Sequence, residues 1–327
     1  AAVPEVSQYP TVAGLAVLRD AVAGYVERRF GVAVDPATQI VPVSGAKEAI
    51  FTTPLAFIDR DRNDAGLFAT PGYPIHERGI RFAGGEAIGV RLHGDFVLRA
   101  ADVPADAWER LRFLWACSPH NPTGAVASLA DIRELYEACR RHDTLLFSDE
   151  PYIDLYEDEP PHSALEVAPA GLEGVLAFFS CSKRSGMTGY RTGAIVGDAA
   201  AIAAIKSLRS SVGVASPEFV QRAAAAAWSD DAHVEERRQI FTAKRRVLRT
   251  KLEEDGIRVV GSEAGLYLWV AVDDDVIATK RLLEQGVVVS PGRAFGPGGE
   301  GHIRLALVPT VEECAAAAEV VASCLRD

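Results

Sequence analysis

The segment Ser180–Gly193 combines a lysine, two arginines and several glycines in a pattern suited to imine chemistry. Lys183 directly follows an apolar run that we expect to be a buried strand, and Arg191 comes eight residues later. In an open α/β sheet, ligands bind at the carboxyl ends of strands, where a lysine amine can form an imine with an aldehyde. Arg191 could bind a phosphate beside it, helped by the hydroxyl of Ser180. Taken alone, Lys183 could equally lie in a basic surface loop.

Two further motifs carry groups that could act with this lysine. Asn121 opens the sequence Asn-Pro-Thr-Gly after one expected strand, and Asp149 and Tyr152 follow another. Each of these motifs is by itself more typical of a turn. The stretch Ser44–Ile50 is expected to open a helix, whose free backbone amides can hold an anion, although ordinary capping by Ser44 would also explain it.

Arg304 interrupts an otherwise apolar stretch between Gly301 and Leu307. A guanidinium in such a strand should face a partner. The partner is either a ligand carboxylate or a structural ion pair, and the sequence leaves both open.

The elements that must position these residues follow an alternating pattern up to about residue 228. A helix capped by Thr11 is expected to stop near Gly31, and a capped amphipathic helix is expected over Ser128–Arg141. Buried strands are expected at Gly66–Ala69, Phe113–Ala116, Leu145–Ser148, Val175–Phe179 and Ala194–Val196. This alternation predicts an α/β layer fold with a mostly parallel sheet.

The pattern changes near Ser229. A long charged helix is expected over Asp231–Glu254, and it is followed by short apolar runs separated by Gly and Pro. The runs are Ile257–Val260, Gly265–Val270, Val287–Val289 and His302–Val308. We therefore predict an N-terminal arm (1–10), a large cofactor-binding domain (11–228) and a smaller α+β domain (229–327).

Composition excludes several classes of function. A net charge of -11 argues against nucleic acid and anionic membranes as partners. The sequence contains no apolar run of about 18 residues, so no membrane span is expected. Its five cysteines are scattered without a C-x-x-C pair. This spacing suits a reducing cytoplasm and gives no reason to expect a metal site.

Together, these motifs resemble the class I/II aminotransferases of the pyridoxal-phosphate fold type I superfamily in both order and spacing. The resemblance covers nearly the whole chain. It implies a large domain with a mostly parallel central sheet, a smaller α+β C-terminal domain and pyridoxal 5'-phosphate as cofactor. It also implies amino acids and 2-oxo acids as substrates.

The resemblance implies a role for each motif. Lys183 resembles the lysine that holds the cofactor covalently and then moves a proton at the substrate Cα. Asp149 resembles the carboxylate that keeps the pyridine nitrogen protonated, and Tyr152 and Asn121 resemble the pair that hydrogen-bonds the ring hydroxyl oxygen. Arg304 resembles the arginine that binds the substrate α-carboxylate, in a substrate site that Asn121 also lines.

Further residues resemble those that hold the phosphate and the ring. The phosphate cradle would consist of Ser180, Arg191 and the backbone amides of Ala46 and Lys47. Tyr73 falls where an aromatic ring stacks on the cofactor. Tyr9 resembles the tyrosine that reaches the phosphate of the neighbouring subunit, which implies a homodimer with shared sites.

Within the family, the sequence most resembles succinyldiaminopimelate transaminases of lysine biosynthesis, through stretches such as Val43–Ile50 and Ser262–Trp269. The expected reaction pairs N-succinyl-LL-diaminopimelate with 2-oxoglutarate or glutamate. Aspartate or LL-diaminopimelate aminotransferases, C–S lyases and, remotely, effector-sensing regulatory proteins are the alternatives. The family's usual opening segment is missing, and the acidic chain gives no general attraction to an anionic substrate. Local positive charges, such as those of Arg209, Arg293 or Lys47, would have to attract the substrate instead.

Overall fold

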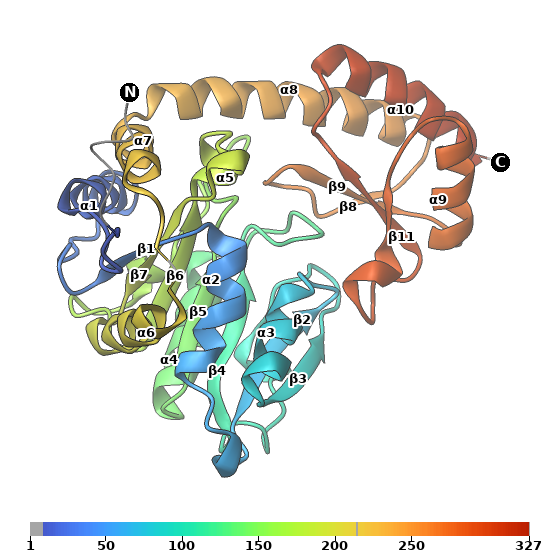
Figure 1. The fold of residues 1–327 in the computed structure, drawn as a ribbon. Coiled ribbons are helices and arrows are strands. Elements are labelled where there is room, and N and C mark those ends of the chain that lie inside the picture. Colours follow the sequence, from blue (N-terminus) through green and yellow to red (C-terminus); the bar gives the residue numbers. More distant parts are fainter. Residues whose placement is uncertain (1–8, 214, 327) are drawn as a thin grey trace.

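A seven-stranded sheet forms the centre of the computed structural model, which describes residues 9–213 and 215–326 (Figure 1). Its strands are β1 (Ile40–Val43), β2 (Ala65–Thr70), β3 (Glu86–Arg91), β4 (Leu111–Cys117), β5 (Leu145–Asp149), β6 (Val175–Ser180) and β7 (Gly193–Gly197). They lie in the order β1-β7-β6-β5-β4-β2-β3. Only β7 runs antiparallel to its neighbours, β6 and β1. The predicted α/β fold with a mostly parallel sheet is therefore confirmed.

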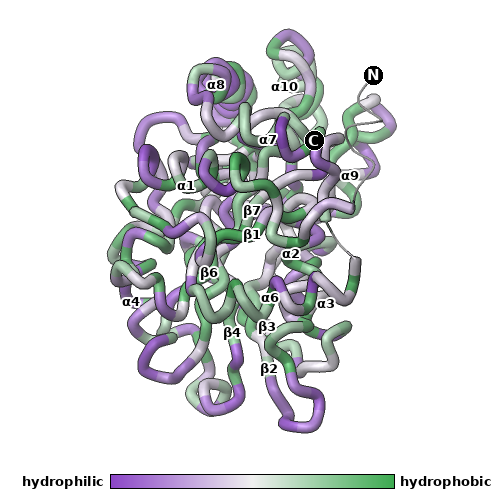
Figure 2. Tube along the Cα trace, turned by 60° about the vertical axis from the view of Figure 1, so that its left-hand side comes forward, coloured by the Kyte–Doolittle hydropathy of each residue, from purple (hydrophilic) through white to green (hydrophobic). Residues whose placement is uncertain are grey.

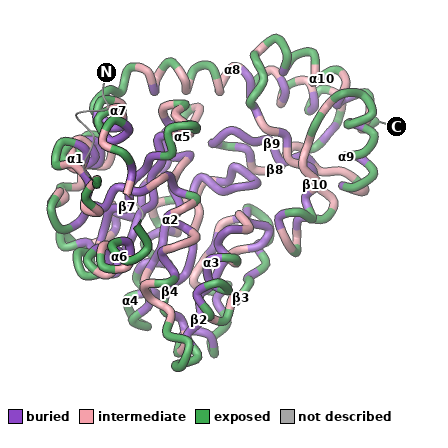
Figure 3. The backbone as a smooth tube through the Cα atoms, viewed as in Figure 1, coloured by how far each residue is buried: buried purple, intermediate pink, exposed green. Residues whose placement is uncertain are grey.

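Helices cover both faces of this sheet. One face packs against α1 (Ala16–Phe30), α4 (Leu129–Arg141) and α7 (Glu218–Ser229), and the other against α2 (Ala46–Thr52), α3 (Ile75–Ala83) and α6 (Ala199–Val212). Successive strand residues point to opposite faces, so Leu114 joins the first hydrophobic core and Trp115 the second. The strands are accordingly mostly hydrophobic (Figure 2) and buried (Figure 3).

A second, antiparallel sheet has a hydrophobic core of its own. It contains β8 (Val259–Val260), β9 (Tyr267–Ala271), β10 (Ser290–Pro291) and β11 (His302–Ala306), in the order β10-β11-β9-β8. The helices α8 (Ala232–Glu254), α9 (Asp275–Glu284) and α10 (Val311–Arg326) pack around it. In Figure 1, α8 runs along the top from α7 to α10 and so joins the two sheets. The domain boundary at residue 229 stays a prediction, and residues 1–8 of the predicted arm lie outside the described residues.

Short helical turns complete the chain. They are α5 (Cys181–Arg184) and the 3-10 helices η2 (Thr53–Ala56), η3 (Arg60–Arg62), η4 (Ala100–Asp102), η5 (Ala164–Val167), η6 (Thr188–Tyr190) and η7 (Gly292–Phe295). None of the helices in the described part of the chain is both long and apolar enough to cross a membrane.

Two local predictions were wrong. Thr11 does not cap α1, because its carbonyl accepts from Gly14 N (3.0 Å) in a turn that precedes the helix, and α1 begins only at Ala16. Its predicted end is confirmed by Gly31, whose φ of 69° lies in the left-handed region. The run Val287–Val289 forms no strand, since pairing with β11 begins at Ser290.

The strands β1 and β3 were not predicted, and both lie at edges of the sheet. β1 contains Pro42, which normally argues against a strand but is tolerated at an edge. β3 is largely exposed and contains Gly89, so it lacks the apolar run of a central strand.

Candidate active site

A cavity of about 180 Å³ lies where the carboxyl ends of β5 and β6 meet the start of α2. It is lined by nine of the residues predicted from the sequence: Ala46, Lys47, Tyr73, Asn121, Asp149, Tyr152, Ser180, Lys183 and Arg191. These residues come from six separate segments of the chain. Their convergence in one cavity gives the site its geometry, and the chemical role of each remains a prediction.

Lys183 lies in the one-turn helix α5 and not in the loop that the sequence suggested. The turn forms because Ser180 Oγ accepts from Ser182 N (3.1 Å) and caps it. Arg237 of α8 donates to the carbonyl oxygen of Lys183 (3.3 Å). Partial burial, followed by the positive charges of Arg304, Arg237 and Arg191, lowers the pKa of Lys183. At a given pH, a larger fraction of this lysine is therefore in the neutral, nucleophilic form than of an ordinary exposed lysine.

Arg184, the residue after Lys183, anchors this turn. Its buried guanidinium pairs with Asp154 (3.2 Å) and with Asp231 (2.6 Å), just before α8. It also lies over the rings of Tyr25 and Trp228, at 4.8 and 5.0 Å from their centroids. These contacts hold α5 against α1, α7 and the start of α8.

Asp149 presents one bound and one unbound carboxylate oxygen. Its Oδ2 lies 3.1 Å from Nε2 of His76 and 3.9 Å from Sγ of Cys117. Burial raises the pKa of the Cys117 thiol, so the sulfur stays protonated and can donate to the carboxylate. Oδ1 is buried and has no hydrogen-bond partner within the described residues. An unsatisfied buried acceptor requires an explanation, and the protonated nitrogen of a pyridine ring would satisfy it.

His76, which holds Asp149, was not among the site residues predicted from the sequence. The imidazole is buried and stacks on Trp115, with centroids 4.8 Å apart and planes at 15°. His76 lies three residues after Tyr73, in the same short motif as a predicted site residue. Its position at the start of α3 was the only feature of the sequence that could have indicated a role in the site.

The start of α2 and Arg191 form a cradle for an anion. Arg191 donates to the carbonyl oxygens of Thr188 (3.0 Å) and Ser44 (3.4 Å), and it pairs with no carboxylate of the described chain. The position before α2 is occupied by Gly45 and not by a capping Ser44. A Cβ on Gly45 would lie 2.5 Å from Nη2 of Arg191. The missing side chain therefore allows the guanidinium to approach the free amides of Ala46 and Lys47.

Arg304 does not line the cavity but contacts Asn121, which does, and within the described residues it has no carboxylate partner. Its Nη1 donates to Oδ1 of Asn121 (2.9 Å), and its guanidinium carbon lies 4.1 Å from the ring centroid of Tyr267 and 4.5 Å from that of Phe295. No salt bridge in the described part of the chain includes Arg304, and its Nε is buried without a partner. A structural ion pair is thus not the reason for this arginine, and a ligand carboxylate fits it.

Two tyrosines, Tyr73 and Tyr152, line the cavity. The hydroxyl of Tyr152 lies 3.2 Å from that of Tyr267, which was not predicted as a site residue. Burial raises the pKa of Tyr152 and, with a further contribution from Asp149, that of Tyr73. Both phenols therefore remain neutral and can donate hydrogen bonds.

The remaining predicted residues lie elsewhere. Tyr9 is 98% exposed and contributes nothing to the cavity of its own chain. Arg209 is buried and pairs with Glu48 (2.7 Å), and Arg293 pairs with the buried Asp275 (2.7 Å). Of the three cations suggested for attracting an anionic substrate, only Lys47 lines the cavity.

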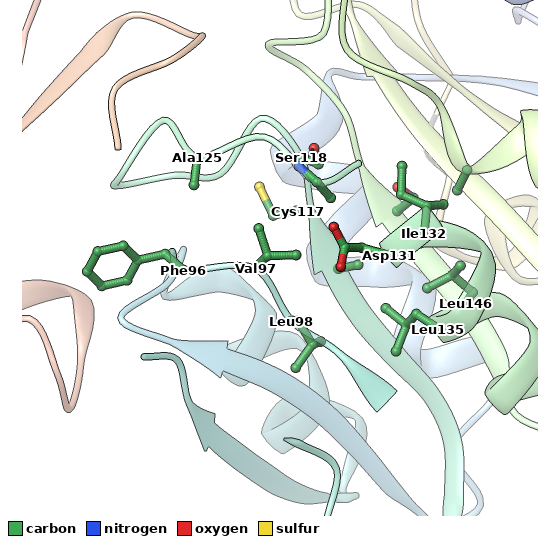
Figure 4. A pocket seen from close by; sticks show the side chains of 14 residues that line it. Phe96, Val97, Leu98, Cys117, Ser118, Ala125, Asp131, Ile132, Leu135 and Leu146 are labelled. Atoms are coloured by element: carbon green, nitrogen blue, oxygen red, sulfur yellow. Dashed lines mark hydrogen bonds between the residues drawn. The ribbon is translucent and has the colours of Figure 1, made fainter. Parts of the chain in front are cut away.

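A second cavity lies on the α4 face of the sheet. Figure 4 shows Val97, Leu98, Cys117 and Ile132 pointing into it. Its volume of about 30 Å³ leaves room for only a few water molecules. The one charged residue in its lining, Asp131, already pairs with Arg99 (3.0 Å). Among the lining residues there is no set of groups that could support catalysis.

Comparison with known proteins agrees with this geometry. The family model for aminotransferase class I and II matches residues 1–321. The chain is 38% identical to the 4-dedimethylamino-4-oxo-anhydrotetracycline transaminase OxyQ of Streptomyces rimosus, over 97% of this chain and 86% of that protein. It is 36% identical to an LL-diaminopimelate aminotransferase of Nitratidesulfovibrio vulgaris, over 93% of this chain and 80% of the relative.

Solved structures show the same architecture. An aminotransferase from Neisseria meningitidis superposes with a TM-score of 0.93 at 31% identity, covering 99% of this chain and 86% of that one. A probable N-succinyldiaminopimelate aminotransferase from Thermus thermophilus superposes with a TM-score of 0.92 at 28% identity, covering 98% and 88% of the two chains.

Proposed function

The chain belongs to the class I and II aminotransferases, and from this premise we propose that it transfers the amino group of a long, doubly acidic amino acid to a 2-oxo acid. As a member of that family it has the type I fold and is a pyridoxal-phosphate-dependent transaminase. The orphaned oxygen of Asp149 is the single observation that best supports a pyridine ring in the cavity.

The proposed division of labour follows from the chemistry of the side chains. Bound pyridoxal phosphate supplies an aldehyde for the amine and a ring that withdraws electrons from Cα. Asp149 keeps a proton on the ring nitrogen, and Tyr152 and Asn121 hydrogen-bond the ring hydroxyl oxygen. The amine of Lys183 would bind the aldehyde with loss of water and, once a substrate amine has displaced it, would move a proton from Cα to the carbon of the former aldehyde.

Binding and orientation fall to a second group of residues. Ser180, Arg191 and the amides of Ala46 and Lys47 hold the phosphate, and Tyr73 stacks on the ring. Arg304 binds the α-carboxylate through two parallel hydrogen bonds, which fixes the direction of the bond that breaks at Cα.

For the substrate, our first choice is N-succinyl-LL-diaminopimelate, with 2-oxoglutarate and glutamate as the partner pair. Support comes from the resemblance to succinyldiaminopimelate transaminases and from the Thermus thermophilus structure. LL-diaminopimelate is the nearest alternative, because relatives at 33–36% identity carry that name. Both compounds place a carboxylate far from the reacting carbon.

A second candidate function is the amination of a large cyclic ketone. It is favoured by the 38% identity to OxyQ, whose name describes a transaminase of a tetracycline intermediate. A screen of amino donors against 2-oxoglutarate and polycyclic ketones, followed by cofactor absorbance, separates the two. Transamination leaves the cofactor in its amine form, whereas a C–S lyase regenerates the aldehyde.

We also propose that the enzyme is a homodimer with shared sites. The support is the exposure of Tyr9, whose ring contacts little of its own chain. Sedimentation at decreasing concentration tests this proposal. Full activity of a monomer would contradict it.

Borohydride reduction tests the assignment on which all of these roles depend. Treating the cofactor-loaded protein with borohydride should fix the cofactor covalently on Lys183, as read by peptide mass spectrometry. Lys183→Ala should retain some cofactor through the phosphate cradle but transaminate negligibly. Labelling of a different lysine, or of none, would overturn the assignment.

A further inference from the structure

A larger cavity, of about 530 Å³, opens beside the candidate active site. It lies between α3 and β3 on one side and the segment Arg293–Pro297 on the other. Tyr73 lines both cavities. Phe295 lines the larger one and also lies beneath the guanidinium of Arg304. The two cavities are therefore neighbours that share the side chain of Tyr73, and we call the larger one the basic cleft.

The charge of the basic cleft is opposite to that of the protein. Four arginines line it, against a single carboxylate, Glu77, although the chain as a whole has a net charge of -11. Arg81 pairs with Glu77 (2.7 Å), and Arg293 is held by Asp275. The other two arginines, Arg78 and Arg91, form no salt bridge within the described residues. Glu300 nevertheless lies near Arg91, because backbone hydrogen bonds and then the charge of Arg91 lower the pKa of Glu300.

The exposed side chain of Arg91 passes close to Gly298, which follows η7. A Cβ on Gly298 would lie 3.1 Å from Nε and 3.3 Å from Cγ of Arg91. Gly298 also has a φ of +88°, a conformation that other residues rarely adopt. The glycine thus leaves room for the side chain of Arg91 beside the segment after η7, and the guanidinium stays accessible to a carboxylate.

We propose that the basic cleft binds the distal carboxylate of the amino-acid substrate through Arg91 and Arg78, while Arg304 binds the α-carboxylate. This assignment rests on the proposed function and adds the residues that select the substrate. The methylenes between the two carboxylates would pack along Tyr73 and Phe295, the aromatic residues between the two anion sites. The ligand class is therefore an amino dicarboxylic acid with a long aliphatic chain.

The test compares Arg78→Gln, Arg91→Gln and the double variant with Arg62→Gln, which removes an exposed arginine outside the cleft. The first measurement is calorimetric titration of each cofactor-loaded protein with pimelate, which has two carboxylates and no amine to react. The double variant should weaken pimelate binding by about tenfold, the order expected for losing charge-assisted hydrogen bonds at a partly exposed site. Arg62→Gln should bind as the unaltered protein does.

The second measurement is a donor series with one and two carboxylates. The Michaelis constants of 2-aminoadipate, LL-diaminopimelate and N-succinyl-LL-diaminopimelate should rise by about tenfold in the double variant. The Michaelis constant of norleucine, which has one carboxylate, should stay within about twofold of its value in the unaltered protein, because no group of norleucine reaches the arginines. Arg91→Lys keeps the charge without the fork and should recover part of the loss.

Different results would overturn the distal-carboxylate site and the proposed transaminase function. If the double variant binds pimelate and uses dicarboxylic donors as the unaltered protein does, the distal site is overturned while the transaminase stands. If no donor reacts, including norleucine and glutamate, the proposed function fails, and the pimelate titration still decides the cleft. Because both arginines are exposed, the single variants should melt at the same temperature as the unaltered protein.

Discussion

Nε2 of His76 lies 3.1 Å from Oδ2 of Asp149, and both side chains are buried beneath the cavity. An ionised carboxylate can only accept hydrogen bonds, so the imidazole is the donor. The contact fixes the orientation of the carboxylate and leaves Oδ1 directed to another partner. His76 therefore acts through Asp149 and is a positioning residue.

Replacing either member of this pair should have effects of different size. Asp149→Ala removes the charge that keeps the ring nitrogen protonated, and turnover should fall by orders of magnitude while the fold survives. His76→Phe keeps the stacking on Trp115 and loses only the hydrogen bond, so it should reduce turnover by about tenfold. Steady-state kinetics and the pH dependence of the bound cofactor's absorbance measure the effects of both substitutions. Near-normal turnover of Asp149→Ala would show that the assignment is wrong.

The lowered pKa of Lys183 predicts a specific pH dependence. Below its pKa, the amine carries a proton and cannot react with an aldehyde. Because burial and the charges of Arg304, Arg237 and Arg191 lower that pKa, the reactive form persists to a lower pH than in an ordinary lysine. Arg237→Gln removes one of these charges, so the pKa should rise and the profile should move to higher pH.

The rate at which cofactor-free protein takes up pyridoxal phosphate, measured across pH, reads this shift. Arg238→Gln is the matched control, because Arg238 lies on the same helix and pairs with Glu235. An unchanged profile in Arg237→Gln, or an equal shift in the control, would rule out electrostatic tuning by Arg237.

Arg304→Lys should raise the Michaelis constant and lower turnover together. Lysine keeps the charge but loses the planar fork that holds the carboxylate and orients Cα. A loss of about tenfold or more in kcat/KM is expected for every amino donor. Arg258→Lys, at an exposed position, is the control. A change confined to donors with a second carboxylate would contradict the assignment of Arg304 to the α-carboxylate.

Glu150 makes stability depend on pH independently of catalysis. Burial raises the pKa of Glu150 to about 7, above its ordinary value in the unfolded chain. The folded state therefore favours the protonated carboxyl. This contribution to stability is complete below the unfolded pKa and is lost as pH rises through about 7.

Glu150→Gln cannot ionise and can still accept the hydrogen bond from Ala164 N (2.9 Å). Between pH 5 and pH 8, the unaltered protein should lose on the order of 2 kcal/mol more unfolding free energy than this variant, since one pKa unit corresponds to about 1.4 kcal/mol. Urea denaturation at the two pH values measures the difference. Glu159→Gln, exposed on the following loop, should behave as the unaltered protein does, and equal losses in all three proteins would refute the prediction.

The sequence by itself determined the central sheet and the residues at its mouth. Lys183 and Asp149 follow runs of apolar residues, and the end of a buried strand is a local feature that composition reveals. Parallel strands bring their carboxyl ends to one edge of a sheet, so local positions were enough to predict that these groups meet. The edge strands were missed because an edge carries less apolar signal than the centre.

Tertiary structure decided what each site residue contacts. Asn121 and Arg304 are 183 positions apart, and His76 reaches Asp149, at the end of β5, from α3. The basic cleft depends on β3, an edge strand without a clear pattern, and on a glycine that makes space for Arg91. These contacts arise from how helices pack on the first sheet and from how the two sheets are placed against each other. No pattern within either segment encodes that placement, because the free energy that fixes it comes from packing across the whole molecule.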